Sequence, residues 1–298
     1  NIEDHIDLIS DCDWICEVVL EDLSIKQEIY KKIEKFCSKS SIVSSNTSTI
    51  PLSKLMYGFS EEFKQKFMIT HFFNPPRYMP LLEIVAGKET KQDYINKIVE
   101  FSEIYLGKQI VSCKDTPGFI ANRIGIFWSM VSTQKAYDLD LTIEQADSIV
   151  GKPMGIPKTG IFGLMDLTGI DLKDHVIDSM FKSLPKEDSF FKLYNPDHPL
   201  NPLTKKMVKE GYIGRKGKGG FYRLINDNGE KRKQALDLKS GKYREIIKPS
   251  FESVRSSKKD LKKVVTFNDK GGVYAWEVLS HVLKYAADLI PEISDDIL

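Results

Sequence analysis

The sequence contains no run of about 18 apolar residues, and it therefore predicts no helix that spans a membrane. It also has almost no net charge, because 43 Lys and Arg residues face 42 Asp and Glu residues. A formal charge of +1 argues against a nucleic acid or an anionic membrane as a partner. The four cysteines show no CxxC spacing, so they predict no metal site. Scattered thiols indicate a reducing compartment, most simply the cytoplasm.

Five short apolar segments in the first 114 residues predict an open α/β sheet. They cover residues 14–20, 41–45, 67–73, 81–85 and 109–113. A helical pattern follows the first segment, where Ser24 and Gln27 have the spacing of a capping box. A second helical pattern precedes the last segment, with Thr90 as its expected cap. Strands and helices that alternate at this pitch are typical of a doubly wound fold.

The pattern changes near residue 115, where helical spacing replaces the strands. Thr116 followed by Pro117 predicts a helix start, and Thr142 with Gln145 predicts a capping box at another. The sequence thus predicts three parts: an α/β domain over 1–114, a mainly helical domain over 115–225, and a linker with the start of a second helical domain over 226–298.

A doubly wound sheet normally opens with a strand, a glycine-rich turn and a helix, and this sequence has no GxGxxG that could supply them. The one glycine cluster, Gly214–Gly220, follows no predicted strand. We therefore expect the sheet to lack its first βαβ unit in this chain. We expect the chain to be part of a longer protein, shortened at both ends.

His71 and Glu83 form the candidate catalytic pair. His71 lies on a predicted strand, and a loop with three prolines leads to Glu83 on the next strand. A carboxylate bonded to one ring nitrogen fixes the tautomer and leaves the other nitrogen free to take a proton. That arrangement suits the oxidation of an alcohol. A histidine in a strand is more often structural, so this pattern alone leaves both interpretations open.

Two polar residues are further candidates. Ser48 follows a predicted strand, on the side of an open sheet where ligands bind, although it could equally cap a helix. Asn122 lies in the predicted first helix of the second domain, three residues from Phe119. Its amide could hold a substrate carbonyl, or it could act as a cap or contact solvent.

Six motifs together resemble one enzyme family. They are CDWICEVVLEDLSIK, SSNTST, HFFNP, LLEIV, KDTPGFIANR and GRKGKGGFY, and they lie within residues 12–223. Their order and spacing are similar to those of L-3-hydroxyacyl-CoA dehydrogenases. The segment after residue 225 resembles the bacterial fusion proteins of fatty-acid β-oxidation that join such a dehydrogenase to an enoyl-CoA hydratase.

The resemblance implies a Rossmann-like NAD-binding domain, a helical domain that usually forms a homodimer, and an acyl-CoA substrate. It implies that His71 is the catalytic base and Glu83 its partner, with Ser48 and Asn122 near the reacting carbon. The residues implied to contact NAD are Glu21, Lys26, Ser48, Asn74 and Lys216.

The missing glycine-rich loop is the chain's main departure from this family. Such folds bind the pyrophosphate at a helix N-terminus, so without the loop we expect weak NAD binding or none. Two alternatives to an NAD-dependent 3-hydroxyacyl-CoA dehydrogenase therefore stay open. The chain could be an inactive fragment or dimerisation module of that enzyme, or a related β-hydroxyacid dehydrogenase that uses free acids.

Overall fold

The computed structural model describes residues 4–156, 158–171, 177, 182–193, 195, 197–227, 229–257 and 260–295. The chain forms two compact units. The first unit comprises Asn1–Arg123 together with Leu289–Leu298, and the second comprises Ile124–Asp288. The domain boundaries predicted at 114/115 and 225/226 stay predictions, because compactness alone does not define a domain. No helix in the described part of the chain is long and apolar enough to cross a membrane.

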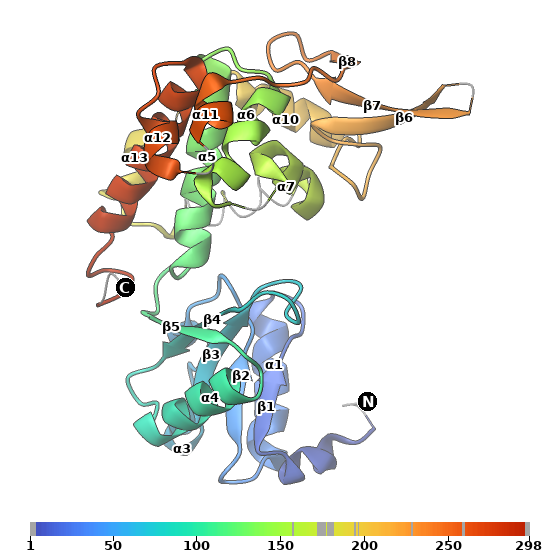
Figure 1. The fold of residues 1–298 in the computed structure, drawn as a ribbon. Helices are drawn as coiled ribbons and strands as arrows, with labels where there is room; N and C mark the ends of the chain where they lie inside the picture. Colours follow the sequence, from blue (N-terminus) through green and yellow to red (C-terminus); the bar gives the residue numbers. More distant parts are fainter. Residues whose placement is uncertain are drawn as a thin grey trace. The chain divides into compact units, whose positions relative to one another are not determined.

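A five-stranded sheet forms the centre of the first unit (Figure 1). Its strands are β1 (Trp14–Glu17), β2 (Ile42–Ser45), β3 (Phe67–Phe72), β4 (Leu81–Ala86) and β5 (Gln109–Cys113), in that spatial order. β1, β2 and β3 run parallel, whereas β4 runs antiparallel to β3 and parallel to β5. The five strands predicted from the sequence are thus confirmed, and so is the α/β fold class.

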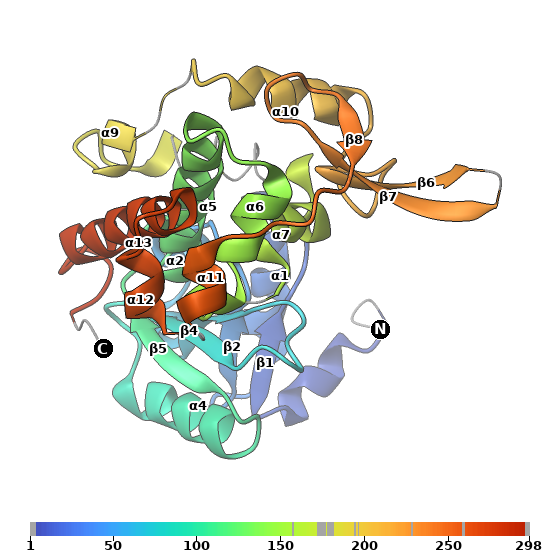
Figure 2. The ribbon, with the colours of Figure 1, turned by 45° about the horizontal axis from the view of Figure 1, so that its top comes forward.

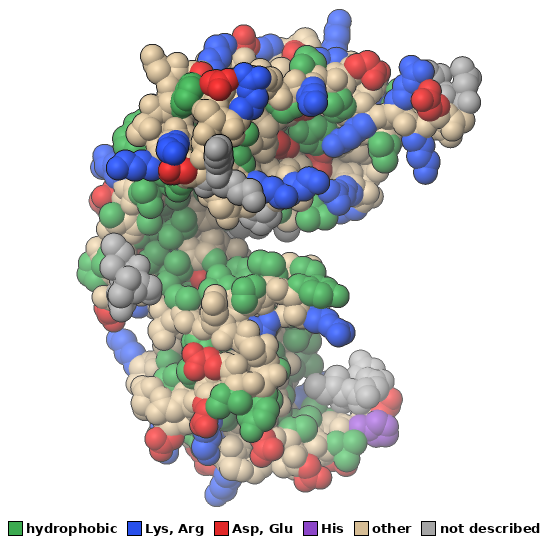
Figure 3. Space-filling model, viewed as in Figure 1, with side chains coloured by type: hydrophobic (Ala, Val, Ile, Leu, Met, Phe, Trp, Pro, Cys, Tyr) green, Lys and Arg blue, Asp and Glu red, His purple; other side chains and the backbone are tan. Residues whose placement is uncertain are grey.

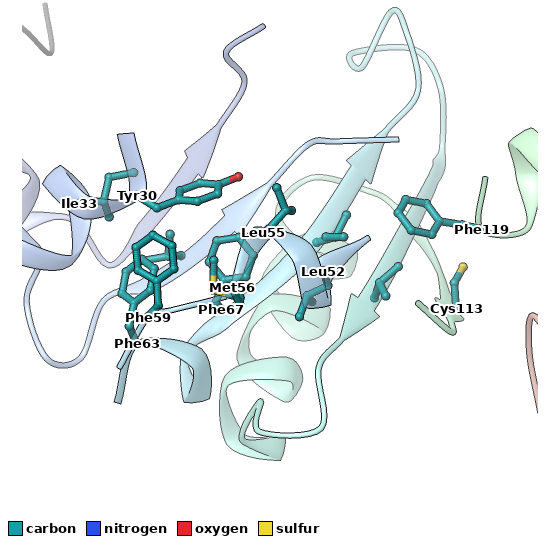
Figure 4. Packing of buried hydrophobic residues seen from close by; sticks show 13 residues of the cluster. Tyr30, Ile33, Leu52, Leu55, Met56, Phe59, Phe63, Phe67, Cys113 and Phe119 are labelled. Atoms are coloured by element: carbon teal, nitrogen blue, oxygen red, sulfur yellow. The ribbon is translucent and has the colours of Figure 1, made fainter. Parts of the chain in front are cut away.

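Helices cover both faces of this sheet. They are the 3-10 helix η1 (Ile6–Asp11) and the α-helices α1 (Leu23–Phe36), α2 (Leu52–Leu55), α3 (Glu61–Gln65) and α4 (Gln92–Ile104). Val43 and Phe67 point to the face that packs against α1, α2 and α3, as Figure 4 shows for Phe67. Their neighbours Ile42 and Met68 point to the other face, against Ile98 of α4. This alternation is the period of two that a strand imposes.

Two predicted helix caps in the first unit are wrong. Asp22, not Ser24, caps α1, since its carboxylate accepts the Ser24 amide at 2.9 Å. Aspartate is as good an N-cap as serine, and a cap at Asp22 lets the helix begin at Leu23, one residue before Ser24. Thr90 does not cap α4, because its hydroxyl donates to the carbonyl of Phe67 at 2.7 Å and accepts the amide of Gly87 at 2.9 Å. At the start of both helices, local hydrogen bonds between a side chain and the backbone therefore explain why the predicted residue is not the cap.

The C-terminal segment of the described chain returns to the first unit. The Lys114 amide donates to the Ile293 carbonyl at 2.9 Å, and Ile293 is buried. The fully buried guanidinium of Arg123 donates from Nη2 to Glu292 Oε1 at 3.0 Å. The second unit is therefore inserted within the sequence of the first.

The second unit is mainly helical. Its helices are α5 (Ala121–Asp138), which begins in the first unit, α6 (Ile143–Ile149), η2 (Lys152–Met154), α7 (Gly160–Thr168), α9 (Phe190–Leu193), α10 (Leu200–Lys209), α11 (Glu252–Ser257), α12 (Leu261–Val265) and α13 (Lys270–Asp288). The capping box of Thr142 and Gln145 is confirmed at the start of α6. The predicted helix start at Thr116-Pro117 is wrong: α5 begins later, because Gly118 and Phe119 have positive φ.

A three-stranded antiparallel sheet lies in the region where the sequence led us to expect a linker. It consists of β6 (Tyr222–Asp227), β7 (Glu230–Leu236) and β8 (Tyr243–Glu245). Figures 1 and 2 show the β6–β7 hairpin extending away from the helices of this unit. Most residues of β7 are exposed and charged, with only Ala235 and Leu236 buried. The alternation of apolar and polar residues that reveals a strand is therefore weak here.

Candidate active site

The structure brings His71 and Glu83 together. His71 lies near the end of β3 and is paired in register with Glu83 on antiparallel β4. His71 Nδ1 lies 2.6 Å from Glu83 Oε2, and both side chains are buried, at 7% and 1% exposure. Since a carboxylate can only accept, the proton of a neutral imidazole lies on Nδ1. Nε2 is then the unprotonated nitrogen, and no hydrogen bond to it occurs within the described residues.

The second oxygen of Glu83 is held by the backbone at the start of α5. Glu83 Oε1 accepts the amide of Ile120 at 3.0 Å and the amide of Ala121 at 2.7 Å. These amides belong to the group that a helix start leaves without internal partners. The carboxylate is therefore oriented from both sides, by an imidazole on one oxygen and by two amides on the other.

Cys113 lies beside Glu83 at the end of β5. Burial, with the nearby charge of Glu83, raises the pKa of its thiol well above the ordinary value. We expect Cys113 to stay protonated and to resist iodoacetamide at about pH 8, whereas exposed Cys12 should react readily. Peptide mass spectrometry after brief labelling of the folded protein checks this. Equal labelling of the two residues would contradict the expectation.

The imidazole of His71 has an aromatic neighbour, and the backbone next to it is tied to the loop after β2. The ring of Phe73 lies 4.6 Å from it, measured between centroids. Asn46, in the loop after β2, accepts the amide of Phe72 on Oδ1 at 2.9 Å and so ties this loop to the end of β3. Sequence reasoning missed Asn46, although its place in SSNTST at a strand end was the available signal.

Glu21 organises the loop that contains Ser48. Its Oε1 accepts the Ser48 amide at 3.2 Å and the Thr49 hydroxyl at 2.9 Å, and it also accepts the Thr47 hydroxyl. Burial opposes ionisation, but the Thr47 hydrogen bond and the charge of Lys26 lower the pKa of Glu21. An ionised carboxylate therefore lies beside Ser48, at the carboxyl-terminal edge of the parallel strands. The hydroxyl of Ser48 makes no hydrogen bond among the described residues.

Lys26 belongs to a buried network that the sequence did not reveal. It is 1% exposed, and its Nζ lies 2.9 Å from Glu17 Oε1 and 3.2 Å from Glu21 Oε2. Glu17 also accepts the hydroxyls of Tyr30 and of Ser45, the latter at 2.7 Å. The ion pair with Lys26 thus fixes the position of the Glu21 carboxylate. A glutamate inside the apolar run WICEVVL was the signal for Glu17.

The other predicted site residues are more dispersed. Asn122 is the second residue of α5, next to Ala121, and is partly exposed. Asn74 is exposed in the loop after β3. Lys216 belongs to the second unit, where its Nζ lies 2.9 Å from Asp171. The functional roles of these residues stay predictions.

A separate cavity of about 970 Å³ opens in the second unit, beside the base of the β6–β7 hairpin. Lys158, Arg215 and Lys233 contribute to its lining, and Figure 3 shows Lys and Arg side chains gathered on this part of the unit. Its acidic residues are already bonded, as Asp166 is by the amides of Phe221 and the residue after it. None of the predicted site residues lines this cavity.

Comparison with known proteins shows the family. The sequence matches the family model for the NAD binding domain of 3-hydroxyacyl-CoA dehydrogenase over residues 1–116. It matches the model for the C-terminal domain of the same enzyme over residues 118–224.

Curated relatives and solved structures agree with these matches. A putative fatty acid oxidation complex trifunctional enzyme of Rickettsia felis is 39% identical over 297 residues, covering 100% of this chain and 40% of the relative. A probable 3-hydroxyacyl-CoA dehydrogenase of Caenorhabditis elegans is 34% identical, covering 72% of this chain and 68% of the relative. The crystal structure of (S)-3-hydroxybutyryl-CoA dehydrogenase from Ralstonia eutropha superposes with a TM-score of 0.57 at 27% identity, covering 70% of each chain.

The chain thus spans less than half of the trifunctional relative, but about two thirds of the dehydrogenase from C. elegans. Two adjacent family models, a relative above 30% identity and a solved structure all point to one group of proteins. The chain belongs to the 3-hydroxyacyl-CoA dehydrogenase family.

Proposed function

We propose that this chain carries the catalytic residues for NAD-dependent oxidation of (S)-3-hydroxyacyl-CoA to 3-oxoacyl-CoA in fatty-acid β-oxidation. The observation that carries the proposal is the buried contact of 2.6 Å between His71 and Glu83. His71 lies at the carboxyl-terminal end of β3. The loops that follow β1 and β2 leave the sheet at this same edge, because the three strands are parallel. In open α/β sheets, ligands bind outside that edge.

His71 would act as the general base in this reaction. Because Nδ1 donates to Glu83, Nε2 is the atom that accepts the proton of the substrate hydroxyl. Bound NAD would supply the acceptor for the hydride that leaves the carbon bearing this hydroxyl. The Glu83 carboxylate then stabilises the imidazolium, and the amides of Ile120 and Ala121 keep that carboxylate in place.

The residues at this edge fit the nicotinamide side of NAD better than its pyrophosphate. Glu21 and Ser48 offer polar groups beside the end of β2. The first amides of α1 are already bonded to the Asp22 carboxylate, which would repel a phosphate. We propose NAD contacts through Glu21, Ser48, Asn74 and Lys216, with Lys26 acting through Glu21. The affinity of this chain for the cofactor should be weak.

Substrate contacts, assembly and location belong to the same proposal. Asn122 follows directly after the amide that holds Glu83, so its side chain would lie near the reacting carbon together with Ser48. The second unit would form a homodimer. The four cysteines are all free, which agrees with a reducing compartment such as the cytoplasm.

The test is the oxidation of NADH by acetoacetyl-CoA, followed by absorbance, for this chain and for the complete natural protein that contains it. Turnover by the complete protein supports the dehydrogenase proposal, and absence of turnover in both contradicts it. Titrating NADH against this chain by fluorescence tests the alternative of an inactive fragment. Binding in the micromolar range would argue against that alternative.

A further inference from the structure

The segment between β5 and α5 makes an unusual backbone turn. Gly118 has a φ of 77° and Phe119 a φ of 48°, so two consecutive residues lie in the left-handed region. A phenylalanine rarely adopts this conformation, because its Cβ crowds the following carbonyl. Among the described residues, Asp140 is the only other non-glycine with a positive φ. Such a backbone persists where its surroundings impose it, and it is frequent at functional sites.

The surroundings of Phe119 hold it in this conformation. Its side chain is 1% exposed and belongs to the apolar cluster of the first unit, where Figure 4 shows it at one end of the cluster near Cys113. Its amide donates to the Thr116 carbonyl at 3.1 Å. On the other side of the turn, the Gly118 carbonyl accepts the Arg123 amide at 3.1 Å. Packing and hydrogen bonds thus fix the turn from both sides.

The turn determines where the next two amides point. Immediately after it, the amides of Ile120 and Ala121 converge on the same oxygen, Glu83 Oε1, at 3.0 and 2.7 Å. A backbone amide cannot rotate independently of its chain, so the φ values of the two preceding residues set its direction. A residue with ordinary negative φ at position 118 or 119 would aim these amides elsewhere.

We propose that the Gly118–Phe119 turn is a positioning element for His71. By fixing the two amides it holds Glu83 Oε1, so that Oε2 keeps the proton on His71 Nδ1 and leaves Nε2 free. Phe119 is a positioning residue here, because it acts through Glu83 and not on the substrate. The catalytic meaning of the free Nε2 rests on the proposed dehydrogenase function.

The test uses two glycines of the same segment. In Gly118→Ala the new Cβ would lie 3.3 Å from the Arg123 amide nitrogen, at a φ that alanine resists. Gly125→Ala is the matched control, since a Cβ on that residue of α5 meets no atom within 4 Å. We expect Gly118→Ala to lower the Nδ1-protonated fraction of neutral His71, measured by ¹⁵N NMR of histidine-labelled chain. In the complete protein it should lower kcat by about tenfold or more, because catalysis is sensitive to small displacements. Gly125→Ala should do neither.

Three further variants keep the proposal falsifiable. Phe119→Leu keeps an apolar side chain at the same φ but removes the ring, which lies 5.9 Å from that of His71, and we expect the tautomer to be unchanged. If Gly118→Ala does not fold, Gly118→Asn replaces it, since asparagine tolerates the left-handed region. Asparagine should then disturb the tautomer less than Phe119→Pro, which cannot adopt a positive φ.

Two results would overturn the proposal. One is an unchanged tautomer and kcat in Gly118→Ala compared with Gly125→Ala. The other is a tautomer shift in Phe119→Leu as large as that in Gly118→Ala, which would assign the effect to the ring. The NMR measurement needs no substrate. If the complete protein showed no turnover, the dehydrogenase proposal would be contradicted, but the NMR result would still test the role of the turn.

Discussion

Replacing His71 by glutamine should lower kcat for 3-hydroxyacyl-CoA oxidation by about 10²- to 10⁴-fold in the complete protein, the range that general base catalysis contributes. Glutamine can occupy the space and accept hydrogen bonds, but it cannot take the hydroxyl proton as Nε2 does. The affinity for NADH should change little, because the proton transfer involves only the reacting end of the site. Steady-state kinetics and an NADH titration measure the two quantities.

His198 offers a matched control for that substitution. It is also a buried histidine beside a carboxylate, with Nε2 lying 3.3 Å from Asp138 Oδ1, but it belongs to the second unit. His198→Gln should leave kcat nearly unchanged in protein that remains folded. Full turnover in His71→Gln would remove His71 from the mechanism, and an equal loss in both variants would indicate a general effect on folding.

Replacing Glu17 by glutamine should lower the free energy of unfolding of the first unit by about 3 kcal/mol, as expected when one partner of a buried ion pair is removed. Glu17 is 4% exposed and accepts hydrogen bonds from Lys26, Tyr30 and Ser45. The variant leaves the ammonium of Lys26 buried, with only the half-exposed Glu21 as its anionic partner. Urea unfolding followed by circular dichroism measures the change.

A double-mutant cycle separates the ion pair from simple loss of packing. Lys26→Met removes the cation, so Glu17→Gln should cost less in that background than in the unchanged protein. Glu61→Gln, which breaks the exposed pair with Lys64, should change the stability little. Strictly additive effects of Glu17→Gln and Lys26→Met would show that the two side chains do not stabilise each other.

The sequence was sufficient to predict the sheet of the first unit and the pair of His71 and Glu83. Buried strands are short apolar runs, so segments such as FMITHFF were recognisable. His71 and Glu83 were found through their motifs, and the antiparallel register of β3 and β4 makes them neighbours. The links to Ile120 and Ala121 could not be predicted, because they depend on the backbone at Phe119, a residue type that gives no sign of a positive φ.

Two other features were not predicted, because they too depend on local hydrogen bonds. Asp22 and Ser24 are both good caps, and only the packed position of α1 decides between them. The strand β7 begins with four charged residues, so it lacks the apolar alternation that would reveal a strand. A side-chain bond to the backbone fixes the start of α1, and backbone pairing forms the β6–β7 hairpin; composition records neither.

The return of the described residues 289–295 to the first unit has a consequence for how the chain is made. On the ribosome, the second unit is synthesised between the two parts of the first. Until Glu292 and Ile293 leave the exit tunnel, Arg123 and the end of β5 lack the partners that they have in the finished protein. Domains usually fold in the order of their synthesis. Here the unit that begins first is the last to be completed.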